Sequence, residues 1–174
     1  MWYMIIRKCL KDDIEDVSKF YDDIIIYLDN HINYPKWEYK IYPSIISVRA
    51  NTNKGTQYLV IDNNEIIGSF VLNNDPEGSY YKAKWSRNID NFMAVHAFAI
   101  RPDYQGKGIA SKVLKYCIET AKELGNEGIR LDIVPTNVPA RKLYEKNGFK
   151  YVCDIDLDRN IDDIPEFSLF ELYF

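Results

Sequence analysis

The sequence predicts one mixed α/β domain with a mostly antiparallel sheet, spanning residues 1–174. Its length of 174 residues is ordinary for a single domain with its own core. Short apolar segments bounded by turn residues are typical of strands, and Asp62-Asn63-Asn64-Glu65 joins two of them as a tight hairpin. A long amphipathic segment between the apolar strands at Ile100 and Ile129 predicts one parallel crossover.

The first half of the chain predicts a strand, two helices and the hairpin. Trp2–Arg7 alternates as a first strand. Apolar residues at three- and four-residue spacing then predict a helix, and they are Ile14, Val17, Phe20, Tyr21, Ile24 and Ile25. The stretch 30–43, rich in aromatic residues, is expected to be irregular or short-helical, and 44–50 to form another helix. Gln57–Ile61 and Ile66–Leu72 are the hairpin strands.

The middle of the chain contains the strongest helix signal. After a polar excursion over 73–91, Met93–Ile100 is an apolar strand that Pro102 ends. Lys107–Leu124 then carries an apolar face and a charged face, and Gly125 is placed to cap its C-terminus.

The C-terminal part predicts three strands around a short helix. Ile129–Val134 alternates as a strand. Pro139 is placed to open a short helix, which Gly148 closes. Phe149–Cys153 and Phe167–Tyr173 are expected to form the last two strands.

Composition narrows the class of protein. Hydrophobic residues make up 47% and charged residues 28%, as in ordinary globular proteins. The formal net charge of -4 disfavours a nucleic-acid partner, and no stretch approaches the roughly 18 apolar residues of a membrane helix. Met1–Asp13 has too short an apolar run for a signal peptide. Cys9, Cys117 and Cys153 form no disulfide or metal-binding pattern, so we expect reduced thiols and a cytoplasmic location.

The junction of strand and long helix carries the most informative motif, Gln105-Gly106-Lys107-Gly108-Ile109-Ala110. Glycines let backbone approach a ligand, and the N–H groups of a helix's first turn attract an anion such as a pyrophosphate. A Walker A loop is excluded because Arg101 stands where its first Gly is required. A dinucleotide fingerprint is disfavoured because Ser111 replaces its third Gly.

Two motifs together resemble the GNAT family of N-acetyltransferases. The family signature Gln/Arg-x-x-Gly-x-Gly/Ala is matched by Gln105, Gly108 and Ala110. The segment from Asn137 to Phe149 resembles a second family element, Asn-x-x-Ala-x-x-Leu-Tyr-x-x-x-Gly-Phe. The resemblance implies a mixed, mostly antiparallel twisted sheet flanked by about four helices. It also implies transfer of an acetyl group from acetyl-CoA, without a metal, to a primary amine of a small molecule or protein.

The resemblance further implies where acetyl-CoA binds. It would lie between the strand ending at Ile100 and the strand 129–134, with Asn137 along the pantetheine arm. Backbone groups near the acetyl carbonyl would come from Phe98, Ala99 and Ile100. The pyrophosphate would be held by Gln105, Gly106, Lys107, Gly108, Ile109 and Ala110.

Two residues are candidates for catalysis. Tyr144 matches the family's tyrosine, which would protonate the departing thiolate; its structural alternative is a core aromatic residue. Many family members have a Glu where this chain has Ala94, so we consider His96 as the base, directly or through water. Strand alternation would place His96 on the face of Ala94, Phe98 and Ile100. Its alternative is a structural histidine.

Other features leave several alternatives open. Trp37, Tyr42 and Trp85 fall where the family builds its acceptor site, although ordinary packing explains them equally well. His31 is expected to be structural or at the surface. Asp154-x-Asp156-x-Asp158 begins like a calcium loop, but Arg159 and Pro165 occupy positions that need Gly and Glu.

Alternatives to the predicted activity also remain. They are a non-catalytic acyl-CoA sensor of the same fold and transfer of a longer acyl group. A homodimer through the late strands follows from family analogy alone.

Overall fold

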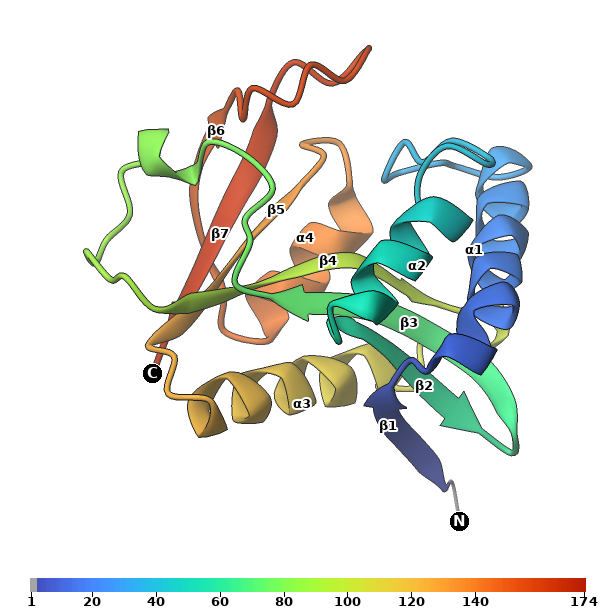
Figure 1. Ribbon diagram of the computed structural model, residues 1–174. Helices are drawn as coiled ribbons and strands as arrows, with labels where there is room; N and C mark the ends of the chain where they lie inside the picture. Colours follow the sequence, from blue (N-terminus) through green and yellow to red (C-terminus); the bar gives the residue numbers. More distant parts are fainter. Residues whose placement is uncertain (1–2) are drawn as a thin grey trace. The chain divides into compact units, whose positions relative to one another are not determined.

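The computed structural model describes residues 3–174 (Figure 1). The described chain contains four α-helices and a seven-stranded sheet with the order β1-β2-β3-β4-β5-β7-β6. β4 and β5 pair in parallel, whereas β1–β2, β2–β3, β5–β7 and β6–β7 are antiparallel. The predicted fold class is therefore confirmed, including the parallel crossover.

The chain divides into two compact units. The first consists of the chain up to Leu72 together with His96–Val113, and the second of Asn73–Val95 together with Leu114–Phe174. β4, Phe92–Ile100, and α3, Ile109–Glu123, each contribute residues to both units.

The strands of the first unit form the predicted hairpin and one further antiparallel partner. These strands are β1 (Met4–Lys8), β2 (Gln57–Asp62) and β3 (Glu65–Asn73). Asn63 and Asn64 connect β2 to β3 with φ angles of 49° and 63°. Two consecutive left-handed residues are the signature of a type I′ turn, whose twist matches that of antiparallel strands. Trp2, the first residue of the expected N-terminal strand, lies outside the described residues.

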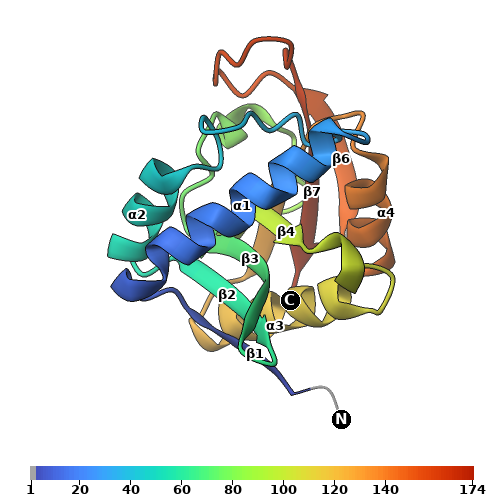
Figure 2. The same ribbon diagram turned by 90° about the vertical axis from the view of Figure 1, so that its right-hand side faces the viewer.

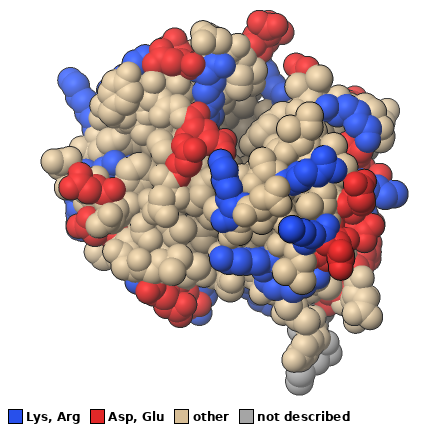
Figure 3. Space-filling view, in the orientation of Figure 1, with Lys and Arg blue, Asp and Glu red and all other residues tan. Residues whose placement is uncertain are grey.

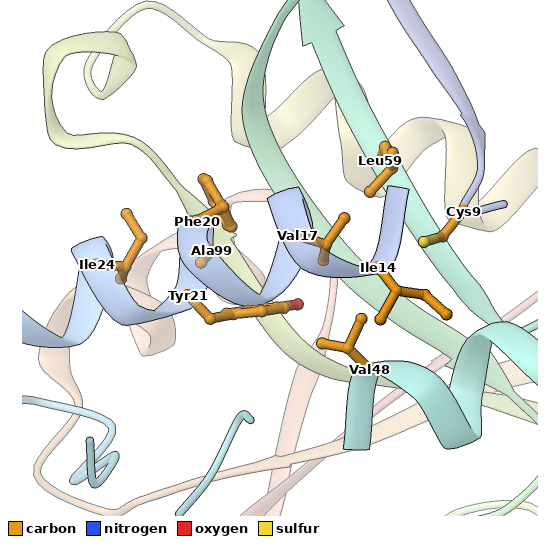
Figure 4. Close-up of a cluster of buried hydrophobic side chains, with 9 residues drawn as sticks. All are labelled: Cys9, Ile14, Val17, Phe20, Tyr21, Ile24, Val48, Leu59 and Ala99. Atoms are coloured by element: carbon orange, nitrogen blue, oxygen red, sulfur yellow. The ribbon is translucent and has the colours of Figure 1, made fainter. Parts of the chain in front are cut away.

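Two helices cover these strands around a common apolar cluster. They are α1 (Ile14–Asp29) and α2 (Ile45–Asn53), close to their expected positions. Figure 2 shows α1 running obliquely across β2 and β3. Figure 4 shows apolar side chains of α1 in one buried cluster with Val48 of α2, Leu59 of β2 and Ala99 of β4. Burying a large apolar side chain stabilises a fold by about 1.5–3 kcal/mol, so this cluster is a main source of the unit's stability.

A bulge in β4 was not predicted. Ala97 has φ of 48°, a left-handed conformation that is uncommon for a residue with a Cβ. The Tyr21 hydroxyl donates a hydrogen bond to the Ala97 carbonyl at 2.7 Å and accepts one from Gln57 Nε2 at 3.2 Å. Tyr21 is completely buried. A buried, fully paired phenol therefore holds the bulge in place.

The second unit contains the strands β5 (Gly128–Ile133), β6 (Lys150–Ile155) and β7 (Phe167–Tyr173), and the helix α4 (Val138–Lys146). In Figure 1, α4 lies beside these strands. The ring of its Tyr144 lies 6.3 Å from the ring of Phe170 in β7. The order of strands and helix agrees with the prediction to within a few residues at each boundary.

One ion pair joins two loops of the second unit to β5. The Arg159 guanidinium donates both Nη groups to the Asp132 carboxylate at 2.7 and 2.8 Å. Arg159 also donates to the carbonyls of Pro76 and Glu77 at 3.0 and 2.6 Å. Tyr80 donates to the same Asp132 at 2.6 Å. The long β6–β7 connection and the excursion 73–91 are therefore fastened together.

The described residues have no helix that is long and apolar enough to cross a membrane. Acidic and basic side chains are interspersed over the face seen in Figure 3. All three cysteines are free thiols; Cys9 and Cys117 are buried and Cys153 is half-buried.

Candidate active site

The predicted phosphate loop lies in the first unit between β4 and α3. After Ile100 the chain forms a short 3-10 helix, Pro102–Tyr104, and α3 begins at Ile109. Gly106 and Gly108 both have left-handed φ, 74° and 77°, and a Cβ on either would meet no heavy atom within 4 Å. Glycine is favoured there by the backbone angle, and the loop backbone is open to a ligand.

The electrostatics of this loop suit an anion. The Lys112 N–H donates to the Gly108 carbonyl at 3.1 Å, which starts the helical hydrogen-bond ladder. The N–H groups one turn earlier lie at the positive end of the α3 dipole, a general feature of phosphate sites. Lys107 is exposed between the two glycines and adds a positive charge. The residues present therefore fit the pyrophosphate of a CoA molecule.

Gln105 connects the loop to the end of β4. Its side-chain Nε2 donates to the Ile100 carbonyl at 3.1 Å, and its backbone N–H donates to Pro102 at 3.1 Å. This bond gives Gln105 a structural role in the loop that the sequence analysis did not anticipate.

The left-handed Ala97 lies directly after His96 in β4. Ala97 and Ala99 both pack with the cluster under α1, whereas Phe98 lies edge-on to Phe70 with ring centroids 6.1 Å apart. Regular alternation of side chains is interrupted at a left-handed residue. The prediction that His96 shares a face with Phe98 and Ile100 assumed an uninterrupted strand, and it stays a prediction. His96 itself is buried, with 8% of its surface exposed.

Tyr144 of α4 is a buried phenol in the second unit. Its ring lies edge-on to Phe149 at 5.5 Å and tilted against Phe170 at 6.3 Å. Within residues 3–174 its hydroxyl makes no hydrogen bond. Burial raises the pKa of Tyr144 well above its ordinary value, so the phenol stays protonated at neutral pH.

Asn137 is the N-cap of α4. Its side-chain carbonyl accepts a hydrogen bond from the Ala140 N–H at 3.2 Å. The Asn-x-x-Ala part of the second motif is thus a helix cap in this chain. The preference for Asn at an N-cap, followed by Pro139 in the first turn, was a signal available in the sequence.

The aromatic acceptor candidates have different surroundings. Trp37 packs edge-on to Tyr21 at 5.9 Å, and Tyr42 is 39% exposed. Trp85 belongs to the second unit, where its Nε1 donates to the Tyr80 carbonyl at 2.8 Å and the Arg130 guanidinium lies 4.3 Å from its ring. Trp37 and Trp85 thus make packing contacts, and the acceptor role of these two residues and of Tyr42 stays a prediction.

His31 agrees with its expected surface position. It is exposed, and its ring stacks on Tyr27 with centroids 4.0 Å apart.

One buried carboxylate escaped the sequence analysis. Asp22 of α1 is 8% exposed, and one of its oxygens pairs with the Lys40 ammonium. Its Oδ1 is buried without a hydrogen-bond partner. From the sequence, an acidic residue inside an amphipathic helix is expected to face solvent. Only the fold of the segment 30–43 brings Lys40 to Asp22.

The acidic run that resembles a calcium loop has other partners. Asp158 pairs with Ser79 and Lys82, and Asp154 accepts a hydrogen bond from Ser168. Within residues 3–174 no cluster of three or more His, Cys, Asp or Glu side chains has the arrangement of a metal site.

Comparison with known proteins identifies the family. The model of the acetyltransferase (GNAT) family matches residues 19–149, which is well over half of the chain. The chain belongs to the GNAT acetyltransferase family.

Two curated relatives match part of the chain. An uncharacterized N-acetyltransferase, YycN, of Bacillus subtilis is 27% identical over 53% of this chain and 53% of its own length. The alanine N-acetyltransferase of ribosomal protein bS18 from Haemophilus influenzae is 31% identical over 62% of this chain and 64% of its own. The chain thus spans about half of the first relative and less than two thirds of the second.

Solved structures match over nearly the whole length. A GNAT acetyltransferase of Streptococcus agalactiae has a TM-score of 0.80 at 17% identity, covering 100% of this chain and 98% of its own. The yncA protein of Salmonella typhimurium, a putative acetyltransferase described with its cofactor acetyl-CoA, has a TM-score of 0.67 at 17% identity, covering 98% and 93%. At such identities the likeness establishes the GNAT fold.

Proposed function

We propose that this protein transfers an acetyl group from acetyl-CoA directly to a primary amine, on a small molecule or on a protein. The observation that carries the proposal is the junction of β4 and α3. There, two left-handed glycines, an exposed lysine and a helix N-terminus form an anion site in a chain of the GNAT family. Asn137 and Tyr144 of the second family motif support the same function.

Acetyl-CoA supplies a thioester whose carbonyl carbon the amine nitrogen attacks. The new C–N bond forms, the C–S bond breaks, the amine loses a proton and the thiolate gains one. Gln105–Ala110 binds the pyrophosphate, and a backbone N–H between Phe98 and Ile100 stabilises the charge that develops on the carbonyl oxygen. No metal takes part in this scheme.

Tyr144 is the proposed proton donor to the thiolate. Its burial keeps the phenol protonated, and its hydroxyl makes no hydrogen bond within the described chain. A proton donor must carry its proton at the working pH and have a hydrogen bond to give to the leaving group. Tyr144 meets both conditions.

His96 is the proposed base, acting directly or through a water. An amine with a pKa near 10 is only about 0.1% neutral at pH 7, so a nearby proton acceptor increases its reactive fraction. The choice of His96 rests on the absence of an acid at Ala94 and on the position of His96 in β4, next to the bulge.

A non-catalytic acyl-CoA sensor is the second candidate. The specific observation in its favour is the fully buried Ala94, where many family members carry a Glu. A third possibility is transfer of a longer acyl group, which the size of the acyl pocket near Phe98 would decide.

A turnover assay separates these candidates. Purified protein is supplied with acetyl-CoA and, in turn, with polyamines, amino acids and peptides that have free N-terminal or lysine amines, and release of the CoA thiol is followed. Thiol release that depends on one amine class supports the enzyme. Binding of acetyl-CoA with no turnover on any amine would contradict it and favour the sensor.

We further propose that residues 1–174 act as one domain in the cytoplasm. A homodimer is proposed through the late strands, because β6 is an edge of the sheet and its Tyr151 is 42% exposed. Light scattering on the purified protein tests the dimer, and a monomeric mass at all concentrations would remove it.

A further inference from the structure

Tyr104 and Lys107 form a contact beside the phosphate loop. The Lys107 ammonium lies 5.2 Å from the centre of the Tyr104 ring. This distance is within the range of a cation–π attraction. Lys107 stands between Gly106 and Gly108, residues that by themselves leave its backbone little constrained. The Tyr104 ring is therefore a specific restraint on the position of this charge.

The Tyr104 ring is in turn supported from β3. Its hydroxyl lies 3.5 Å from Glu65 Oε2, a long polar contact. The other oxygen of Glu65 lies 3.3 Å from Arg101 Nε. Arg101 itself donates from its backbone N–H to Ile67 and from Nε to Ile66, both at 2.8 Å. The short 3-10 helix that carries Tyr104 is thus attached to the start of β3 at several points.

We propose that Tyr104 is a positioning residue for phosphate binding, which holds the Lys107 ammonium beside the loop where a phosphate of CoA binds. The proposal rests on the proposed function, because it requires CoA in the loop. A lysine loses much rotamer freedom when it contacts a ligand, and a side chain held in place beforehand loses less. Tyr104 therefore increases affinity without touching the ligand itself. Glu65 acts one step further away, by orienting the ring.

The ligand chemistry is a phosphate group, which CoA offers in two places. One is the pyrophosphate and the other is the 3′-phosphate on the ribose. Titrations with CoA and with 3′-dephospho-CoA distinguish them. If Lys107 faces the 3′-phosphate, the effect of changing Tyr104 is seen with CoA and is lost with 3′-dephospho-CoA. If Lys107 faces the pyrophosphate, the effect is the same with both.

A double-mutant cycle tests the proposal by calorimetry at low salt. Tyr104→Leu removes the π face and keeps an apolar side chain; it is expected to raise the Kd for CoA about two- to fivefold, the size of an exposed cation–π contact. Lys107→Met removes the charge and is expected to raise the Kd about tenfold, as for a hydrogen bond to a charged group. Adding Tyr104→Leu to Lys107→Met is expected to change the Kd by less than about 1.5-fold, since coupled residues are not additive.

Two further variants serve as controls. Tyr104→Phe keeps the ring and removes the hydroxyl that contacts Glu65, so we expect less than about a twofold change in the Kd, as for one weak contact. Tyr81→Leu removes a tyrosine that is 83% exposed on the other unit, and it should leave the Kd unchanged.

The outcomes separate this inference from the proposed function. The positioning role would be overturned if the unaltered protein binds CoA but Tyr104→Leu raises the Kd equally in the presence and absence of Lys107. The loss of affinity would then be structural. An unchanged Kd for Tyr104→Leu would overturn it as well. Failure of the unaltered protein to bind CoA would instead remove the proposed function, and this inference with it.

Discussion

Tyr21 in the first unit and Tyr144 in the second are both buried phenols, but the fold uses their hydroxyls differently. Tyr21 donates to the Ala97 carbonyl and accepts from Gln57, so both of its hydrogen-bonding functions are satisfied inside the protein. The Tyr144 hydroxyl has no such partner within residues 3–174. Burial alone therefore does not separate the two tyrosines, whereas the accounting of their hydrogen bonds does, and it supports the chemical role that we propose for Tyr144.

The largest effect expected from this comparison is on turnover. Tyr144→Phe removes the proposed proton donor and should lower kcat about 100-fold or more, the usual contribution of a positioned acid. The Kd for acetyl-CoA should stay within about twofold, because the deleted hydroxyl is assigned to the leaving group and not to binding. Steady-state kinetics with the best amine of the panel measure the first quantity and calorimetry the second.

Tyr81→Phe is the matched control for that change. Tyr81 is 83% exposed and lies outside the proposed site, so the kcat of the Tyr81→Phe variant should equal that of the unaltered protein. Unchanged turnover in Tyr144→Phe would assign the buried phenol to packing and end its catalytic role.

The next effect concerns two glycines with the same backbone conformation. Gly108 and Gly125 have φ of 77° each, and a Cβ on either meets no heavy atom within 4 Å. Gly108→Asp places a carboxylate in the phosphate loop and should weaken acetyl-CoA binding at least about tenfold by charge repulsion. Gly125→Asp carries a similar backbone strain, about 1–2 kcal/mol, at the far end of α3 and should bind normally. Equal loss of binding in both variants would show that strain, and not charge in the loop, is responsible.

A smaller effect is expected on stability. Tyr21→Phe leaves the Ala97 carbonyl and the Gln57 amide without their shared partner and should lower the free energy of unfolding by about 1–3 kcal/mol. Tyr144→Phe removes no hydrogen bond within the described chain and should change it by less than about 0.5 kcal/mol. Urea unfolding of the two variants makes the comparison directly. Equal destabilisation of the two variants would mean that both hydroxyls make stabilising hydrogen bonds in the folded protein.

The smallest effect is the response to alkaline pH. Burial raises the folded-state pKa of both Tyr21 and Tyr144, so the unfolded chain loses these protons first. The contribution of the two neutral phenols to the free energy of unfolding is then fully present below pH 10. It falls as the pH rises above 10, by up to about 1.4 kcal/mol per pH unit for each tyrosine. Thermal unfolding between pH 9 and 11 should give a shallower decline in either Phe variant than in the unaltered protein. An identical slope in all three would contradict the assigned pKa directions.

Much of the fold was predictable because its signals are local. The spacing of apolar residues placed α1 and α3, and Asn63 and Asn64 marked a turn that needs two left-handed residues. The bulge at Ala97 was not predictable, since an alanine inside an apolar strand gives no sign of a left-handed angle. The carbonyl of Ala97 accepts a hydrogen bond from Tyr21, a residue 76 positions earlier that reaches it only in the folded chain.

The candidate site also has features that the sequence signals and features that only the folded chain reveals. The two-glycine loop could be located because its backbone chemistry requires glycine at fixed positions. The capping role of Asn137 is local and its signal was available in the sequence. The support of Tyr104 by Glu65 and the pairing of the buried Asp22 with Lys40 depend on contacts between separate elements. The face of His96 stays a prediction, because a left-handed residue that the sequence does not signal lies directly after it.

Calorimetric titration of the unaltered protein with acetyl-CoA, with CoA and ATP as parallel ligands, is the decisive test of the phosphate loop. We expect saturable binding of acetyl-CoA and CoA in the micromolar range, typical of enzyme substrates, and no binding of ATP. Absence of binding by both CoA species would contradict the assignment of the loop Gln105–Ala110, and the acetyltransferase proposal would fall with it.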